Sequence, residues 1–512
     1  MISSLLQKKH YFLIVVLLFA VFLRFWNISN TVQFLGDQGR DSLIVSKIFK
    51  EKDLVFIGPV TSVGNMYLGP LYYYFMVPFL MISYPSPLGP VYAVAFLGVL
   101  TIYLMYALGK ELMGEKVALA ATTLMAFSAT VVAGTRFSWN PNPAPLASLV
   151  MIYFVFKALR KNEKYWVLVV LCFSVLIQLH YLTLLSGLGF GSLWLWQLYQ
   201  KHKNKKSIKK MIVLTVIGGL IFIISLTPLI LFDIKHDGLN FQAFKKIISG
   251  ENSFEQQSLT SVEKINKYLV NTKNRGSQIL LELSISDQKN LNNYLFLFSI
   301  VILFLSLRDS QILAINGKSK DHYFGKIIII TFLITGIFGT ALYKHTIFDH
   351  YIAYLFPVSF FALGLIGEYL YKKGISGKFA IGLFLILFAN YNVSKMSKVL
   401  SSTGSTMNKI WSTSKTITDR VMDGEKYNIV LLTGTGDIDG QNYRYFLSTT
   451  DKPPVEMEDR GKIDTLFIIN DDKVLKNVAD SPIYEIVVFP NKTPSEVYQI
   501  DDGPEITVLR RN

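Results

Sequence analysis

The sequence predicts an all-α polytopic membrane protein with about eleven transmembrane helices, followed by a small α/β domain at the C-terminus. Of the 512 residues, 51% are hydrophobic and only 17% are charged, and the apolar residues fall into long runs. A soluble chain has about 25% charged residues, so much of this chain requires a non-aqueous solvent. Aromatic residues gather at the ends of the apolar runs, as at Tyr165 and Trp166, where amphipathic rings settle at a membrane interface.

The formal charge of +15 comes from short lysine clusters between the apolar runs. This spacing is typical of membrane topology and argues against a nucleic-acid partner, which would require a basic face or a module interleaved with aromatic residues. The single cysteine, Cys172, lies within an apolar run. One cysteine allows no disulfide within the chain, so it indicates nothing about the compartment.

Eleven apolar stretches approach the roughly 20 residues that cross a bilayer. They lie at about residues 11–27, 88–109, 117–134, 143–159, 165–180, 182–199, 211–232, 291–307, 325–343, 351–371 and 377–393. Lys8 and Lys9 precede the first stretch, and Arg24 follows it where a signal peptide would have small residues for cleavage. We therefore predict an uncleaved first span with the N-terminus in the cytoplasm of a multi-pass plasma (inner) membrane protein.

A twelfth candidate, residues 67–83, is short and contains Gly69, Pro70 and Pro78. If this segment does not cross, the lysine-rich loops at residues 110–116, 157–164, 201–210, 308–320 and 372–378 all face the cytoplasm, as the positive-inside rule requires. We therefore predict a re-entrant or juxtamembrane helix on the outer face. The first outer loop then covers residues 28–87 and a long outer loop covers residues 233–290.

The chain divides into a membrane domain, residues 1–393, and a polar extracytoplasmic domain, residues 394–512. The pattern of the second domain predicts a helix near 406–422 and strand-like runs at 427–432, 465–469, 484–489 and 505–509. Residues 434–440 read GTGDIDG. They lack the spacing of a dinucleotide loop or of a calcium hand, and they predict a glycine-rich turn between a strand and a helix.

The first outer loop carries the acids best placed for catalysis. Asp37 and Asp41 flank Arg40 and adjoin glycines, just beyond the first span and before a predicted helix at residues 42–50. A carboxylate here can accept a proton from a hydroxyl at the bilayer surface. The alternative is that Asp37 or Asp41 caps the helix that follows, because Asp is favoured at that position.

Other outer segments offer cations. Arg136 begins a short outer loop, and its guanidinium suits a phosphate, although an arginine at the end of a span also snorkels to the interface. Lys235 and His236 end the seventh span, and His345 and His350 lie in the turn between spans nine and ten. Histidines beside carboxylates can bind a metal, relay a proton or hold a phosphate. Their spacing is not that of a zinc protease, and single histidines at span ends are often interface residues.

The order of these motifs resembles that of the membrane-embedded GT-C glycosyltransferases. It resembles specifically the bacterial members similar to protein O-mannosyltransferases and to the lipid A aminoarabinose and rhizobial lipopolysaccharide transferases. The resemblance covers residues 8–393. It rests on the acidic loop motif, the patch at residues 69–74, the basic end at 109–116, Arg136 with Asn140 and Pro141, residues 228–236, and His350 and Tyr351 with Phe356 and Pro357.

The resemblance implies transfer of a sugar from a polyprenyl-phosphate carrier to an acceptor glycan, lipid or protein at the outer face. Asp37 then stands at the position of the catalytic base, while Gln38 replaces the second acid of many relatives and Asp41 follows four positions after Asp37. This departure leaves a divalent metal open; no other cofactor is implied. The cations Arg136, Lys235, His236, His345 and His350 would neutralise the phosphate. Arg40, Tyr72 and Tyr351 would bind substrate.

Two other functions stay open on the sequence. The first is a transporter or flippase of lipid-linked or anionic solutes, which would place charged residues near mid-membrane. The second is a glycan polymerase or ligase that uses a lipid carrier. Most charged residues of this chain flank the spans, which favours chemistry at the surface over alternating access.

Overall fold

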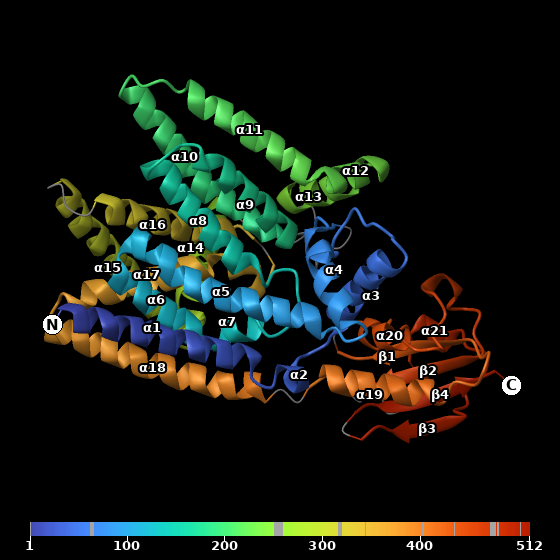
Figure 1. The fold of residues 1–512 in the computed structure, drawn as a ribbon. Helices are drawn as coiled ribbons and strands as arrows, with labels where there is room; N and C mark the ends of the chain where they lie inside the picture. The colour runs from blue at the N-terminus through green and yellow to red at the C-terminus, as the bar shows by residue number, and fades with distance from the viewer. Residues whose placement is uncertain are drawn as a thin grey trace.

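The computed structural model describes residues 2–61, 66–249, 260–315, 320–343, 345–401, 404–434, 436–471, 478, 481–501 and 503–511. Helices packed side by side form one body, and a small sheet with its own helices lies beyond one end of that body (Figure 1). The short helices α3 (Gly36–Lys50) and α4 (Leu71–Ser83) lie between the two parts. This order agrees with the predicted class, a polytopic helical protein with a small C-terminal α/β domain.

All eleven predicted spans are helical. The helical body contains α1 (Ile2–Phe25), α5 (Leu88–Met113), α6 (Glu115–Phe127), α7 (Ala129–Gly134), α8 (Ala144–Arg160), α9 (Tyr165–Leu179), η1 (Tyr181–Leu185), α10 (Ser186–Lys203), α11 (Lys209–Ser225), α12 (Thr227–Lys235), α14 (Ser261–Ser277), η3 (Gln278–Glu282), α15 (Lys289–Ile315), α16 (Lys320–Ala341), η4 (Asp349–Leu355), α17 (Phe356–Tyr371) and α18 (Ile375–Leu400). The connecting helices are α2 (Ile28–Thr31) and α13 (Leu239–Ser249).

By length and composition, five helices of the described chain could each cross a membrane, and the pair α11 and α12, bent by 58°, makes a sixth. The remaining predicted spans are shorter or broken helices, such as α6 followed by α7 after Ser128. A multi-pass helical membrane protein is therefore confirmed, while the number eleven stays a prediction. Helix α4 packs against α3 and α5, as a helix at the edge of the bundle would.

Helix α3 begins six residues earlier than the predicted start at Ser42. The side chain of Gln38 accepts a hydrogen bond of 2.9 Å from the backbone N–H of Leu35, which satisfies a donor that would otherwise have no partner at the helix start. Leu35 is the N-cap residue. Neither Asp37 nor Asp41 therefore caps the helix; Asp37 lies in its first turn and Asp41 in its second.

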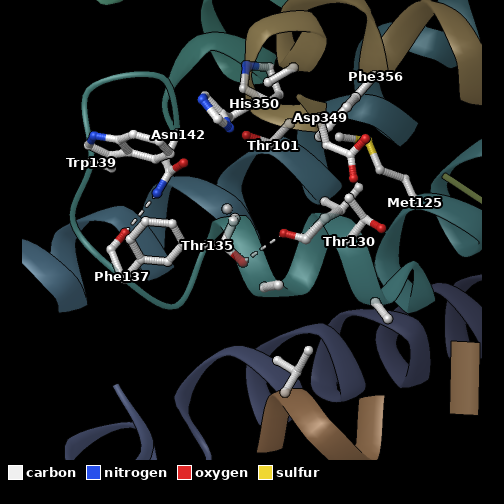
Figure 2. A pocket seen from close by; sticks show the side chains of 18 of the residues that line it. Thr101, Met125, Thr130, Thr135, Phe137, Trp139, Asn142, Asp349, His350 and Phe356 are labelled. Atoms are coloured by element: carbon white, nitrogen blue, oxygen red, sulfur yellow. Dashed lines mark hydrogen bonds between the residues drawn. The ribbon is translucent and has the colours of Figure 1, made fainter. Parts of the chain in front are cut away.

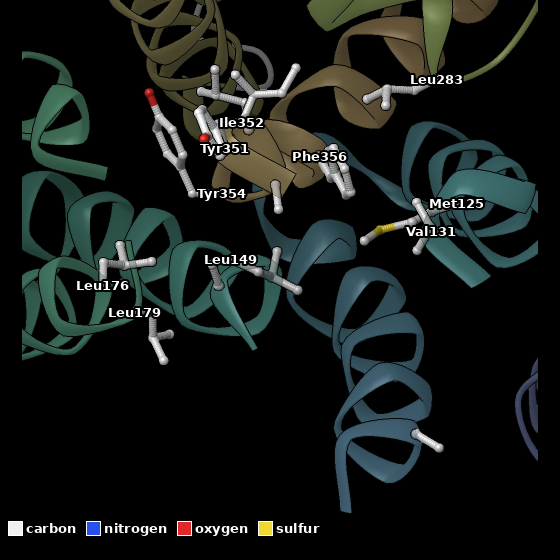
Figure 3. Packing of buried hydrophobic residues seen from close by; sticks show 14 of the residues in the cluster. Met125, Val131, Leu149, Leu176, Leu179, Leu283, Tyr351, Ile352, Tyr354 and Phe356 are labelled. Carbon is white, nitrogen blue, oxygen red and sulfur yellow. The ribbon is translucent and has the colours of Figure 1, made fainter. Parts of the chain in front are cut away.

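The buried core is continuous from the helical body to the C-terminal domain. Figure 3 shows part of it, where Met125, Leu149, Tyr354 and Phe356 come from different helices and meet around η4. Phe360 and Phe361 at the start of α17 are fully buried. This packing fixes η4, and with it His350 and Tyr351, in the interior of the bundle.

The C-terminal domain has a four-stranded sheet in the order β1-β2-β4-β3. Strand β1 (Tyr427–Leu432) is parallel to β2 (Thr465–Asn470), and β4 (Glu505–Arg510) is antiparallel to both β2 and β3 (Glu496–Gln499). Helices α19 (Met407–Thr418) and α20 (Gln441–Leu447), the turn η5 (Met457–Asp459) and α21 (Tyr484–Val487) complete it. The predicted strands at 427–432, 465–469 and 505–509 are confirmed.

The strand predicted at residues 484–489 is wrong, since residues 484–487 form α21. Only Ile486 and Phe489 of this apolar run are buried, and a spacing of three places them on one face of a helical turn. Strand β3 was not predicted, because it is an exposed edge strand without the apolar alternation that marks a buried one. The predicted domain boundary at residue 393 falls inside α18.

The C-terminal domain is joined to the first loop by main-chain hydrogen bonds. Phe34 N–H donates to Ser405 O at 3.1 Å, and Met407 N–H donates to Val32 O at 3.0 Å. On the other side of the loop, the backbone of α3 at Gly39 lies directly against Asn442 of α20. The domain therefore holds the segment that carries the candidate catalytic acids.

Candidate active site

Two acids and one arginine form a cluster on α3. The guanidinium of Arg40 lies 2.9 Å from Oδ1 of Asp37 through Nη1. Through Nε and Nη2 it donates to Oδ1 of Asp41 at 3.0 and 2.7 Å. The side chain of Asp37 is 46% exposed, while that of Asp41 is 1% exposed. Asp37 can therefore meet an acceptor, and Asp41 cannot without a movement of its neighbours.

Asp41 is held from two helices. Tyr73 of α4 donates its hydroxyl to Oδ1 of Asp41 at 3.1 Å, while Oδ2 has no hydrogen-bond partner among the described residues. Burial raises the pKa of Asp41 to about 6, against the opposing effect of Arg40, because a charge removed from water is disfavoured. At neutral pH Asp41 is ionised and anchors Arg40.

A second tyrosine connects this cluster to the helical body. The hydroxyl groups of Tyr72 and Ser138 lie 2.7 Å apart, and both residues are buried. Ser138 stands between Phe137 and Trp139, which line a cavity of about 450 Å³. Tyr72 and Tyr73 are adjacent in α4, so one turn of this helix contacts both Asp41 and the segment that carries the cavity residues Phe137 and Trp139.

The cavity lies among α5, α7, α8, η4 and α18. Figure 2 shows Trp139, Asn142 and His350 toward one end of it, and Thr130, Met125 and Phe356 toward the other. The ring centroids of Trp139 and His350 are 4.3 Å apart. Its wall also includes Lys395 and Lys398 of α18 and the carboxylate of Asp349. The cavity thus combines two lysines, one acid, hydrogen-bonding groups and an apolar end, a composition that suits a polar headgroup with an apolar chain.

Arg136 does not line this cavity in the described structure; its guanidinium instead contacts the end of α1. It donates to Leu23 O at 2.8 Å, to Trp26 O at 2.9 Å and to the hydroxyl of Thr31 at 2.7 Å, and the residue is 5% exposed. The carbonyl groups of Leu23 and Trp26 lie at the end of α1, where a helix leaves its last carbonyl groups without partners. The geometry therefore favours a structural role for Arg136 over the predicted phosphate contact.

The other predicted cations are dispersed. Lys235 and His236 are exposed at the end of α12, where the ring of His236 stacks on Phe232 at 4.0 Å. His345 is exposed, and its carbonyl accepts a hydrogen bond from Arg275. The described structure brings none of these three to the cavity wall. His350 lines the cavity, and Tyr351 lies beside it, 8% exposed, with its ring centroid 4.5 Å away.

Sequence reasoning missed three cations near the cavity: Arg24, Lys395 and Lys398. Lys395 is paired with Asp287 at 2.9 Å, and Lys398 is exposed. A signal was present, since both lysines directly follow the last span, on the predicted outer side, where the positive-inside rule disfavours them. In the sequence, Arg24 indicated only that no signal-peptide cleavage site follows the first span.

Arg24 is a buried charge that has no anionic partner among the described residues. Its side chain is fully buried, and Nη1 donates to the carbonyl groups of Ala20 at 3.2 Å and Ala126 at 3.4 Å. Within the described residues, Nε and Nη2 have no hydrogen-bond partner. Nε lies 3.1 Å from where a Cβ on Gly98 would be, and Gly98 and Thr135 line the cavity. The guanidinium therefore stands directly behind the cavity wall.

The described residues contain no group of three or more histidine, cysteine, aspartate or glutamate side chains that could hold a metal ion. The acids of the α3 cluster are paired with Arg40 instead.

Comparisons with known proteins agree with this architecture. Residues 68–231, about a third of the chain, match the family model described as dolichyl-phosphate-mannose-protein mannosyltransferase. This range includes Tyr72, Tyr73 and Ser138. No curated protein sequence matches the chain.

Solved structures share the fold. ArnT from Cupriavidus metallidurans, crystallised bound to undecaprenyl phosphate, is 10% identical, with a TM-score of 0.59 over 97% of each chain. The oligosaccharyltransferase of Archaeoglobus fulgidus, crystallised tethered to an acceptor peptide, is 14% identical, with a TM-score of 0.51 over 91% of this chain and 69% of that one. These identities show the fold alone. Together with the family match, they confirm the resemblance to the GT-C superfamily glycosyltransferases.

Proposed function

We propose that the protein is a glycosyltransferase that moves a sugar from a polyprenyl-phosphate carrier to an acceptor at the outer face of the membrane. The observation that carries this proposal is the half-exposed Asp37, held by Arg40 and connected through α4 to a cavity with cations in its wall. The ArnT crystal structure with undecaprenyl phosphate supports a lipid-phosphate ligand for this fold.

The carrier phosphate would bind in the 450 Å³ cavity. Lys395 and Lys398 supply positive charge in its wall, where Asp349 also lies, and the ring of His350 supplies a hydrogen-bonding group. Arg24 stands behind Gly98 and Thr135. In a site with little water, a fixed positive charge stabilises the phosphate more strongly than in bulk solvent. A bound phosphate would also give Arg24 the anion that the described residues do not provide.

A second cavity, of about 580 Å³, offers a place for the prenyl chain. It lies among α6, α15, α17 and α18, and its wall is almost entirely apolar, with Leu124, Phe298 and Phe384 among its residues. Leu124 is the neighbour of Met125, which lines the first cavity. A chain that leaves the phosphate between α6 and α18 would therefore continue into this apolar space.

In the proposed reaction Asp37 removes the proton of an acceptor hydroxyl, and that oxygen attacks C1 of the sugar. The bond from C1 to the carrier phosphate breaks, and the phosphate leaves with the bonding electron pair. Because a phosphate is a good leaving group, the protein contributes mainly position and charge. Arg40 orients Asp37, and Asp41 anchors Arg40.

Incubation of the purified protein with a panel of radiolabelled polyprenyl-phosphate sugars and total envelope extract tests this function. We expect label to move from one carrier to a compound that is not a carrier. Label that stays on the carrier in every reaction, or a labelled solute that crosses a vesicle membrane unchanged, would contradict the proposal.

A further inference from the structure

The C-terminal domain contributes a carboxylate at the start of α3. Asp437 lies in the glycine-rich loop, residues 434–440, between β1 and α20. Its Oδ2 is 2.3 Å from where a Cβ on Gly36 would be, so only glycine permits this contact. One turn further, a Cβ on Gly39 would lie 2.4 Å from the backbone of Asn442. The two glycines face the domain, next to the side of α3 that carries Asp37 and Arg40.

The chain is anchored on the C-terminal side of Asp437. Gln441 N–H donates to Oδ2 of Asp437 at 3.1 Å, and Asn442 donates from Nδ2 to Phe34 O at 3.1 Å. Tyr445 donates from its hydroxyl to Pro85 O at 2.8 Å. These bonds connect α20 to the segments before α3 and after α4. The docking of the C-terminal domain therefore fixes the position of Asp437 relative to α3.

We infer that Asp437 is a positioning residue of the catalytic site, which restricts the Asp37 carboxylate to the side of Arg40. This inference rests on the proposed function. Two carboxylates at the start of one helix repel each other, so Asp37 is directed away from Asp437 and toward the guanidinium of Arg40.

The electrostatic environment of Asp437 agrees with this arrangement. Burial raises the pKa of Asp437; the neighbouring charges of Asp439 and Asp37 raise it further, and Arg40 lowers it. The charged groups that act on Asp437 are Asp37 and Arg40 of α3, Asp439 of the same segment and Arg444 of α20, while Arg40 and Asp41 act on Asp37. Arg40 therefore interacts with both Asp37 and Asp437.

Separate measurement of kcat and KM in full-length protein tests the inference. Asp437→Asn keeps the size of the side chain and its acceptor for Gln441 N–H, but removes the charge. Because Asp37 is then no longer held on the side of Arg40, we expect a several-fold lower kcat with an unchanged KM for the carrier. Asp439→Asn, the same charge change two residues further, should leave kcat close to the wild-type value.

A variant pair provides a second test. Gly36→Ala should lower kcat, because the new methyl group displaces the Asp437 carboxylate. In an Asp437→Gly background the same substitution should have a smaller effect, since the obstructing carboxylate is gone. A wild-type kcat in Asp437→Asn, or additive effects of the pair, would overturn the inference while leaving the proposed function intact. A wild-type protein that transfers no sugar would overturn both.

Discussion

Arg40 directs two of its nitrogens, Nε and Nη2, at a single carboxylate oxygen of Asp41, at 3.0 and 2.7 Å. The third nitrogen, Nη1, is then directed at Asp37, one helical turn earlier than Asp41. The guanidinium is planar, so fixing two nitrogens fixes the direction of the third. A buried acid thereby sets the orientation of an accessible one.

This geometry predicts that Arg40→Lys lowers turnover by at least tenfold. An ammonium is a point charge on a flexible stem and cannot bridge Asp37 and Asp41 in a fixed geometry. The measurement is kcat of sugar transfer, with the thermal stability of the purified variant as a check on folding. Arg160→Lys is the matched control, since Arg160 also pairs with an aspartate, Asp321 at 2.6 Å, outside the candidate site. Equal turnover in the two variants would remove Arg40 from the mechanism.

Asp37→Asn should lower kcat by about 10² to 10⁴-fold, the usual contribution of a general base. The amide retains the size of the side chain but accepts no proton at neutral pH. Asp53→Asn is the control, because Asp53 is exposed in the same loop and lies outside the α3 cluster. Full transfer activity in Asp37→Asn would show that the first loop is structural.

Asp41→Asn should change how the stability of the protein depends on pH. The pKa of Asp41 in the folded state, about 6, is above its ordinary value of 3.8. Because the folded protein binds this proton more tightly than the unfolded chain, the raised pKa stabilises the fold at pH values below the pKa of the unfolded state. This contribution to the free energy of unfolding is lost as the pH rises through about 6. Between pH 4.5 and 7, the melting temperature of the wild type should therefore fall relative to that of Asp41→Asn. A difference in melting temperature between the two proteins that is the same at pH 4.5 and at pH 7 would contradict the raised pKa.

The helical architecture could be read from the sequence because long apolar runs permit few folds in a bilayer. Strands β1 and β2 could also be read, because every residue in each is buried and most are apolar. Residues 484–489 were misread, because a short apolar run between prolines is equally compatible with a strand and a helical turn. The start of α3 was also missed, because it depends on one side-chain contact, from Gln38 to the Leu35 N–H.

The acids of the site were found because both stand in one short loop, whereas the cations were mostly not found. A sequence shows that Arg136 is charged, but not that its donors are already used by the end of α1. Nor does it show that the last turns of α18 reach the cavity, or that Asp437 docks on Gly36 across about 400 residues of chain. Such long-range contacts leave no local pattern.

The proposed topology places residues 201–210 in the cytoplasm and the C-terminal domain outside. Single cysteines introduced at Ser207 and Ser412, both exposed, in a Cys172→Ser background test it. An impermeant thiol reagent applied to intact cells should label the cysteine at 412 and not the one at 207, until the membrane is permeabilised. Labelling of the cysteine at 207 in intact cells would contradict the cytoplasmic location of residues 201–210.

The last prediction separates two buried arginines near the same end of α1. Arg24→Met should weaken binding of the carrier by at least tenfold, because it removes a positive charge behind the phosphate cavity. The same variant should keep or raise the melting temperature, since an unpaired buried charge is costly and a methionine of similar length fills the space.

Arg136→Met should do the opposite. Its loss leaves the carbonyl groups of Leu23 and Trp26 without their donors, and an unsatisfied buried acceptor costs about 1 to 3 kcal/mol. The melting temperature should fall, while the affinity of the folded protein for the carrier changes little. Titration of each variant with undecaprenyl phosphate, beside its melting curve, measures both quantities. If Arg24→Met melts earlier and binds the carrier as tightly as wild type, then Arg24 supports the helix end and the phosphate is held by the lysines of α18 alone.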